Sequence, residues 1–287
     1  MSANEIFTYV KQIACALFSL IIPFLGFDSI EYATKAPAEE VTRIMSFNVR
    51  NGEYDRGKIV PQVIADYMPD SVGVQECEGT WYLTLKTYLK ENYAIVGVGR
   101  LTGIKCIGES TAILYRKDKY KLIDSGTFWL SETPDKVSIG WDAKHHRTCT
   151  WVVLENKATG EQYAHINTHL DHMGEQARTN GLDLVLKKAE SFDIPVVVTG
   201  DFNFKKSEPL YTQLISGCLT DTQDTAENSI NGKTYHGYDG GEEGEPIDFI
   251  LTNGKINQVK NYVIIREMYN GSHISDHYPI YADVIMP

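Results

Sequence analysis

Short apolar runs rich in β-branched residues recur along the chain and alternate with stretches of helical periodicity. The strand-like runs cover residues 43–49, 71–75, 93–98, 111–115, 148–154, 163–168, 195–199, 247–251 and 280–284. Apolar residues at helical spacing predict helices through residues 59–67, 80–91 and 175–191. Strands that interleave with helices along a chain are typical of a layered α/β domain.

One of these runs predicts a strand in the middle of the molecule. Residues 195–199 read PVVVT, with no polar residue until the last position. A strand that is buried on only one face alternates apolar and polar residues, whereas a strand covered on both faces does not. We therefore expect residues 195–199 to be buried on both faces.

The N-terminal residues differ in character from the rest. Residues 13–27 form an apolar run that is shorter than the roughly 20 residues of a spanning helix but has the length of a signal-peptide core. Ala36-Pro37-Ala38 is a small-x-small sequence of the kind that signal peptidases cut. We expect residues 1–40 to be a signal peptide or anchor with a linker, and residues 41–287 to be the folded domain. This predicts an extracytoplasmic protein, secreted or membrane-tethered; if the run is instead a buried amphipathic helix, the protein is cytoplasmic.

Composition and charge narrow the function classes. The chain of 287 residues is 43% hydrophobic and 23% charged, which is ordinary for a globular protein and excludes disordered, collagen-like and coiled-coil chains. The net charge of −11 argues against a broad basic surface for nucleic acid, although a local basic groove or a bound cation is compatible with it. The five cysteines are odd in number and share no close spacing, so they predict neither a disulfide framework nor a thiolate zinc site.

Polar side chains with oxygen or imidazole groups stand at or just after the ends of several predicted strands. They are Asn48, Glu76, His169, Asp201, Asn203, Asp248, Asp276 and His277. In layered α/β folds, strand ends are where ligands bind, although a single Asp or Asn there is commonly a cap. If the whole set converges, its carboxylate and amide oxygens suit Mg²⁺ or Mn²⁺, and the two histidines are left for proton transfer.

Six segments of the chain resemble the endonuclease/exonuclease/phosphatase superfamily, and they occur in the order that the family shows. They are MSFNVRNGE (45–53), VGVQE (72–76), HINTHLDH (165–172), VVVTGDFNF (196–204), PIDFIL (246–251) and SDHYPI (275–280). The resemblance implies an α/β fold, a four-layer α/β sandwich of two packed mixed β-sheets flanked by helices. It also implies a Mg²⁺-dependent phosphoesterase site at one rim of the sandwich.

The resemblance further implies how a metal ion is held. Glu76 matches the glutamate that binds metal in the family, and Asn48 matches the asparagine that supports metal and phosphate. Asp276 is expected to hold the metal or to order its loop. The expected cofactor is Mg²⁺, or Mn²⁺ in its place, because a hard cation neutralises phosphate charge as the transition state forms.

The remaining matched residues imply catalytic roles. Asp201 corresponds to the aspartate that activates or orients the attacking water, and Asn203 to the asparagine that positions it. Asp248 and His277 correspond to a carboxylate–imidazole pair, in which the carboxylate fixes the tautomer of the ring. His169 stands where the family has a histidine that contacts phosphate. Which of these groups is the general base stays open at this point.

Candidate specificity residues follow from position and chemistry. Arg50 lies two residues beyond Asn48 and could reach a phosphate, although some family members have an acidic metal ligand at that position. Arg147 ends the basic stretch 144–147, which is either a solvated loop or a phosphate contact. Tyr235 and His236 precede a predicted strand, and they either stack on a base or sugar or pack beneath their loop.

We expect a divalent-metal-dependent hydrolase of phosphate esters that works by in-line attack of water. Its partner is the substrate, a small phosphorylated molecule, a nucleotide or a nucleic acid, and the sequence does not decide between diester and monoester. No obligate protein partner is evident, so we expect a monomer.

Two alternative functions are compatible with the same residues. The first is a zinc-dependent hydrolase, because His169-Leu170-Asp171-His172 is half of a binuclear zinc motif, but Asn167 replaces its first histidine. The second is a catalytically inactive phosphate-ligand binding protein on the same scaffold.

Overall fold

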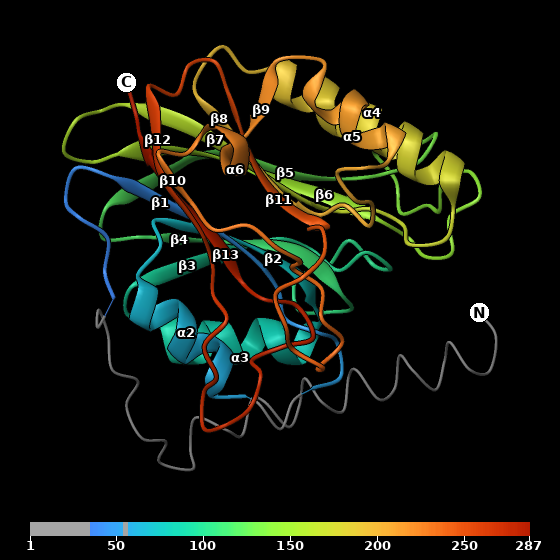
Figure 1. The fold of residues 1–287 in the computed structure, drawn as a ribbon. Coiled ribbons are helices and arrows are strands. Elements are labelled where there is room, and N and C mark those ends of the chain that lie inside the picture. The colour runs from blue at the N-terminus through green and yellow to red at the C-terminus, as the bar shows by residue number, and fades with distance from the viewer. Residues whose placement is uncertain (1–34, 54–56) are drawn as a thin grey trace.

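Two β-sheets packed face to face form the centre of the computed structural model, which describes residues 35–53 and 57–287 (Figure 1). The first sheet has seven strands. In spatial order they are β10 (Asn228–Ser229), β12 (Gln258–Ile264), β13 (Ile280–Ile285), β1 (Thr42–Asn48), β2 (Ser71–Cys77), β4 (Ser110–Arg116) and β3 (Tyr93–Val96). The sheet is mixed, because β1 pairs parallel with β2 and antiparallel with β13.

The second sheet has six strands and is also mixed. In spatial order they are β5 (Tyr120–Trp129), β6 (Thr148–Asn156), β7 (Gln162–His169), β8 (Val196–Asp201), β11 (Asp248–Asn253) and β9 (Leu219–Asp221). Strands β7 and β8 run parallel, and β11 runs antiparallel to β8. The central strands are therefore β7 and β8, which end in the motifs HINTH and VVVTGD, and β11, which begins with DFIL.

Helices cover the outer face of each sheet. Figure 1 shows α2 (Ile59–Tyr67) and α3 (Gly79–Leu89) on the first sheet, and α4 (Glu175–Glu190) and α5 (Pro209–Ile215) on the second. A single turn, α6 (Thr222–Thr225), follows β9. The order of layers is helix, sheet, sheet, helix, and this confirms the predicted four-layer α/β sandwich of two packed mixed sheets.

Strand β8 contributes side chains to two of the apolar clusters of the core. Val197 packs into the cluster between the two sheets, with Ile44, Ile250 and Ile280. Val196 and Val198 point the other way, into the cluster beneath α4 and α5. The strand is fully buried on both faces, as its unbroken apolar sequence predicts.

A set of polar side chains lies between the sheets and is hydrogen-bonded across them. Gln75 Nε2 donates to Asn167 Oδ1 at 2.7 Å, and Thr199 Oγ1 donates to the same oxygen at 3.1 Å. His165 is hydrogen-bonded through both ring nitrogens, to the hydroxyls of Ser71 and Thr199, each at 2.8 Å. Two of these contacts, Gln75–Asn167 and His165–Ser71, join β2 of the first sheet to β7 of the second, so they fix the position of one sheet against the other.

Some elements were not predicted from the sequence. Strand β5 is at the edge of its sheet and largely exposed, so it lacks the apolar pattern of a buried strand. Helix α5 is only seven residues long, and in β12 a bulge near Val259 interrupts the alternation of polar and apolar residues. These elements are short or exposed and therefore leave a weak signal.

The apolar run 13–27 lies outside the described residues. Among the helices of residues 35–53 and 57–287, none is long and apolar enough to cross a membrane.

Candidate active site

Three neighbouring strands of the second sheet each have one end at the same rim of the sandwich. The register pairs His169 at the end of β7 with Asp201 at the end of β8, and Asp201 in turn with Asp248 at the start of β11. All three side chains are almost completely buried. Strand pairing alone therefore places one imidazole and two carboxylates side by side, although they come from distant segments of the chain.

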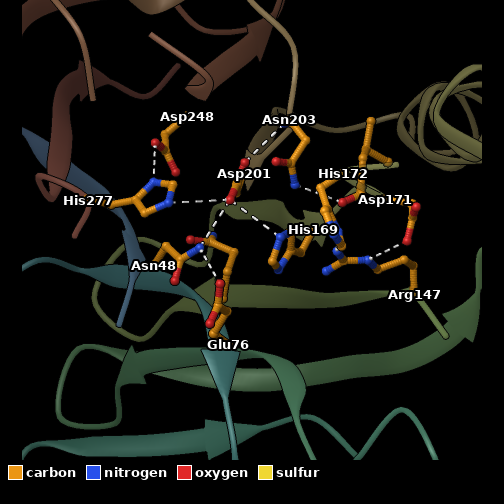
Figure 2. Close-up of polar contacts among 12 residues, drawn as sticks. Asn48, Glu76, Arg147, His169, Asp171, His172, Asp201, Asn203, Asp248 and His277 are labelled. Atoms are coloured by element: carbon orange, nitrogen blue, oxygen red, sulfur yellow. Dashed lines mark hydrogen bonds and ion pairs between the residues drawn. The ribbon is translucent and has the colours of Figure 1, made fainter. Parts of the chain in front are cut away.

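The first sheet contributes Asn48 and Glu76 from the neighbouring ends of β1 and β2 (Figure 2). Asn48 Nδ2 donates to Asp201 Oδ2 at 3.0 Å and to Glu76 Oε1 at 3.2 Å, so this amide joins the two sheets. Glu76 has a φ of 56° and lies where the pairing of β2 with β4 shifts register. A left-handed glutamate is rare, and such strained residues cluster at functional sites.

The loop before β13 supplies Asp276 and His277. Ser275 Oγ donates to the carbonyl of Asn48 at 2.7 Å, which fixes the loop against the end of β1. His277 Nδ1 is 2.8 Å from Asp248 Oδ2, and its Nε2 is 3.8 Å from Asp201 Oδ2. Since Nδ1 donates to Asp248, Nε2 carries a proton only when the ring is positively charged.

Donor groups converge on the carboxylate of Asp201 from several elements (Figure 2). Its Oδ2 lies 3.0 Å from Asn48 Nδ2, 3.4 Å from His169 Nε2 and 3.8 Å from His277 Nε2. Its Oδ1 accepts the backbone N–H of Asn203 at 3.0 Å. Asp201 is therefore the centre of the site, held in one orientation by residues of both sheets.

The charges of this cluster change the pKa values of its members. Burial raises the pKa of Asp201 to about 7, the charge of Asp248 adds to this, and His277 opposes it. Burial would lower the pKa of His277, but the charges of Asp248 and Asp201 raise it to about 10. The pKa of His169 is lowered well below its usual value by burial and by the nearby charges of Arg147 and Arg100. At neutral pH the site thus holds one charged and one neutral imidazole around Asp201.

These residues surround a cavity of about 530 Å³. The predicted site residues that line it are Arg50, Glu76, Arg147, His169, Asp201, Asn203, Tyr235, Asp276 and His277. Asn48 and Asp248 lie behind this lining and are hydrogen-bonded to it. The volume is within the usual range of small-molecule sites.

The structure places His236 elsewhere. It is buried, does not line the cavity, and stacks on Tyr278 with ring centroids 4.0 Å apart. The sequence left open whether Tyr235 and His236 stack on a ligand or pack beneath their loop, and His236 packs beneath the loop. Its neighbour Tyr235 is 50% exposed and lines the cavity beside His277.

Asp171 has a structural role rather than the role of a zinc ligand. Its carboxylate accepts hydrogen bonds from four backbone N–H groups and from Arg147 Nε at 3.3 Å. Although burial opposes the change, these backbone hydrogen bonds lower the pKa of Asp171. Its oxygens join the loop 142–147 to the loop after β7, so these hydrogen bonds occupy the positions at which a zinc ion would bind.

Two further residues, Arg100 and Glu109, line the cavity although no motif pointed to them. Arg100 and Glu109 belong to a loop between β3 and β4 whose sequence carries no periodic or motif signal, so only folding reveals that they reach the site.

The chemistry of the acidic groups fits a hard divalent cation. Glu76 and Asp276 both line the cavity, and Asn48 adds an amide beside Glu76. The carboxylates Asp201 and Asp248 and the imidazole of His277 also form a group whose ligand atoms lie within 4.8 Å of one another. In that group Asp248 is already hydrogen-bonded to His277, whereas Glu76 and Asp276 offer carboxylate oxygens of the kind that a hard cation prefers.

The strand ends of this α/β sandwich bring together a His–Asp pair, a central aspartate and further carboxylates. This combination of fold and site is typical of phosphoesterases. The chain belongs to the endonuclease/exonuclease/phosphatase family, whose model matches residues 45–277. A comparison with curated proteins finds no significant match.

Solved structures agree with this assignment. A family protein from Bacteroides thetaiotaomicron is 31% identical, with a TM-score of 0.80, over 86% of this chain and 98% of that one. A mannosyl-6-phosphatase of Bacteroides thetaiotaomicron is also 31% identical, with a TM-score of 0.79, over 85% of this chain and 100% of that one. The catalytic domain of human Nocturnin shares the fold at 20% identity and a TM-score of 0.68, over 86% of this chain and 94% of that one.

Proposed function

We propose that the protein is a divalent-metal-dependent hydrolase of phosphate esters that acts on monoesters of small molecules. The observation that carries the proposal is the convergence of Asp201, the Asp248–His277 pair and His169 with Glu76 and Asp276 at one cavity. These groups match the demands of in-line attack, in which charge must be stabilised around phosphorus and a water must be oriented.

Glu76 and Asp276, with Asn48 beside them, are the residues that would hold Mg²⁺ or Mn²⁺. Such an ion, when bound, neutralises charge on the phosphoryl oxygens. Arg50 Nη1 lies 3.5 Å from Asp276 Oδ2, so its guanidinium adds positive charge at the same side of the cavity.

Different side chains of the protein have different roles in proton transfer and charge stabilisation. Asp201, whose pKa of about 7 is suited to accepting a proton near neutral pH, is the candidate base for the attacking water. Asn203 holds its Oδ1 through the backbone N–H and so fixes the orientation of the carboxylate. His277 stays positively charged and faces the developing negative charge on the phosphoryl group.

The shape of the site and the comparisons favour small monoesters. A cavity of about 530 Å³ encloses a small molecule, whereas a long nucleic acid needs an open basic groove that a chain of net charge −11 does not favour. One of the similar structures is a mannosyl-6-phosphatase, a name that denotes a phosphomonoesterase. For residues 1–40, the proposal of export rests on the sequence alone.

The test compares a monoester with a diester under defined metals. The full chain is assayed with p-nitrophenyl phosphate and bis-p-nitrophenyl phosphate after chelation and after return of Mg²⁺, Mn²⁺ or Zn²⁺. We expect activity with Mg²⁺ or Mn²⁺ only, and a monoester preference of at least about tenfold. Activity that survives chelation or needs zinc contradicts the proposal, and binding of phosphate without turnover identifies an inactive binding protein.

Substitutions then test the site itself. Glu76→Ala, Asp201→Ala and His277→Ala are each expected to lower kcat by on the order of 10² or more. Asp118→Ala, at an exposed turn, is the control and should keep full activity. Near wild-type turnover by His277→Ala would remove the assigned roles.

A further inference from the structure

One side of the cavity carries charged and imidazole side chains that the proposed reaction does not use. Arg100, Glu109, His145 and His172 line it, and we call this set the polar wall. Figure 2 shows His172, with Arg147, on the other side of His169 from His277. The polar wall is therefore adjacent to the reaction centre but separate from the Asp248–His277 pair.

The charges at the polar wall are paired within the protein. Arg100 Nη1 forms an ion pair with Glu109 Oε1 at 2.5 Å, and Asn51 Nδ2 donates to the second oxygen of Glu109 at 3.3 Å. Arg147, next to the wall, is paired with Asp171 at 3.3 Å. Each guanidinium thus faces a carboxylate, and little net positive charge is left over for a second anionic group.

The two imidazoles add hydrogen-bonding groups to the polar wall. Partial burial, together with the charges of Arg100 and Arg147, lowers the pKa of His145 to about 4. Arg147 Nη2 lies 3.2 Å from His172 Nδ1, and because an arginine can only donate, that nitrogen accepts. The proton of a neutral His172 is then on Nε2, and the two rings stack with centroids 5.5 Å apart.

The polar wall is also held rigidly. The backbone carbonyl of Arg100 accepts Trp129 Nε1 at 2.7 Å, and its N–H donates to the carbonyl of Glu109 at 2.7 Å. The loop between them closes so tightly that a Cβ at Gly99 would lie 1.7 Å from the carbonyl oxygen of Ile107. Arg100 and Glu109 are therefore oriented before any ligand arrives, which lowers the entropic cost of binding.

A rigid, charge-compensated set of donors and acceptors suits neutral hydroxyl groups, each of which both donates and accepts. Resting on the proposed phosphatase function, we propose that the polar wall binds the hydroxyls of a sugar, so that the substrate class is a sugar monophosphate. A second phosphate would face the carboxylate of Glu109 and is disfavoured. The reacting phosphate occupies the Asp201 side, and the sugar extends toward Arg100.

The first experiment measures which leaving group the wild-type enzyme prefers. With Mg²⁺ present, kcat/KM is compared for mannose 6-phosphate, glucose 6-phosphate, glucose 1,6-bisphosphate and n-propyl phosphate, which lacks hydroxyls. We expect at least one hexose 6-phosphate to exceed propyl phosphate by on the order of 10² or more, because propyl phosphate lacks the hydroxyls that hydrogen-bond to the polar wall. Equal rates for hexose and propyl esters, or a preference for the bisphosphate, overturn the sugar assignment.

Failure of the underlying function has a different outcome. If p-nitrophenyl phosphate and all of these esters are inert with Mg²⁺ and Mn²⁺, the proposed phosphatase function itself is wrong. If p-nitrophenyl phosphate is hydrolysed while hexose esters show no preference, only the sugar site is wrong.

The second experiment assigns the preference to the polar wall. Arg100→Gln, Glu109→Gln and the more exposed His145→Ala are expected to lower the ratio of kcat/KM for the preferred hexose ester over propyl phosphate by about 10- to 100-fold, mainly through KM. Arg116→Gln, an arginine paired with Asp118 at the far end of β4, is the matched control and should keep the ratio. An unchanged ratio in all three wall variants, with folding intact by circular dichroism, contradicts the proposal.

Discussion

Asp248 is buried behind His277, and its charge is the main influence that offsets the burial of that imidazole. Burial by itself disfavours the charged ring, yet Asp248 at 2.8 Å and Asp201 at 3.8 Å hold the pKa of His277 at about 10. The same carboxylate helps to raise the pKa of Asp201 to about 7. One residue that does not line the cavity therefore sets the protonation of two that do.

Replacing Asp248 by asparagine tests this arrangement, because the shape is kept and the charge is removed. We expect Asp248→Asn to lower the pKa of His277 and to reduce kcat by on the order of 10² to 10³. The readouts are kcat with p-nitrophenyl phosphate and an NMR titration of His277. Asp118→Asn serves as the control, and a variant of Asp248 that keeps its turnover within about twofold argues against a charge-setting role.

At the level of secondary-structure elements, the site depends on how closely β2 approaches the second sheet. Gly73, in the middle of β2, faces the polar layer between the sheets. A Cβ at Gly73 would lie 2.0 Å from Thr199 Oγ1 and 2.5 Å from Asn167 Oδ1. Only a glycine allows the hydrogen bond from Gln75 to Asn167 and the position of Glu76, three residues beyond Gly73.

Gly73→Ala is therefore expected to be strongly destabilising for its size. The added methyl group must push the sheets apart or break the hydrogen bonds of Asn167, at a cost of about 2 to 4 kcal/mol in the free energy of unfolding. Urea unfolding followed by tryptophan fluorescence measures it. Gly254→Ala, where a Cβ meets nothing within 4 Å, is the matched control and should change stability little. Equal stability of the two variants would contradict the close approach.

For the whole molecule, stability is linked to pH through the histidine buried between the sheets. Burial lowers the pKa of His165 to about 3, below the value of about 6.5 for an unfolded histidine. Between these two values the unfolded chain binds a proton that the folded chain does not. The contribution of His165 to stability is therefore complete above about pH 6.5 and is lost progressively as the pH falls toward 3.

This linkage predicts a loss of about 2 kcal/mol of unfolding free energy from His165 alone between pH 7 and pH 5. Urea unfolding of the wild type and of His165→Asn at both pH values measures it. The variant starts less stable, because hydrogen bonds to Ser71 and Thr199 are altered, but it should lose correspondingly less on acidification. The same loss in both proteins would show that His165 does not carry the pH dependence.

Local pattern was sufficient for the elements that are regular and buried. The apolar run of β8, the helical spacing of α4 and the motifs around Asn48, Asp201 and His277 were each legible in the sequence, because burial and motif chemistry act over a few neighbouring residues. Edge strand β5 and the short helix α5 were not, since exposure and shortness remove that signal.

The sequence by itself determined the layered α/β class and the family, and it predicted which residues have side chains suited to metal binding and proton transfer. Only the tertiary structure decided that Asp201 lies at their centre, that His236 packs away from the cavity, and that Arg100 and Glu109 reach it. The physical reason is that these outcomes depend on strand register, sheet-to-sheet distance and loop closure. Those properties arise from contacts between segments far apart in the chain, which no local pattern encodes.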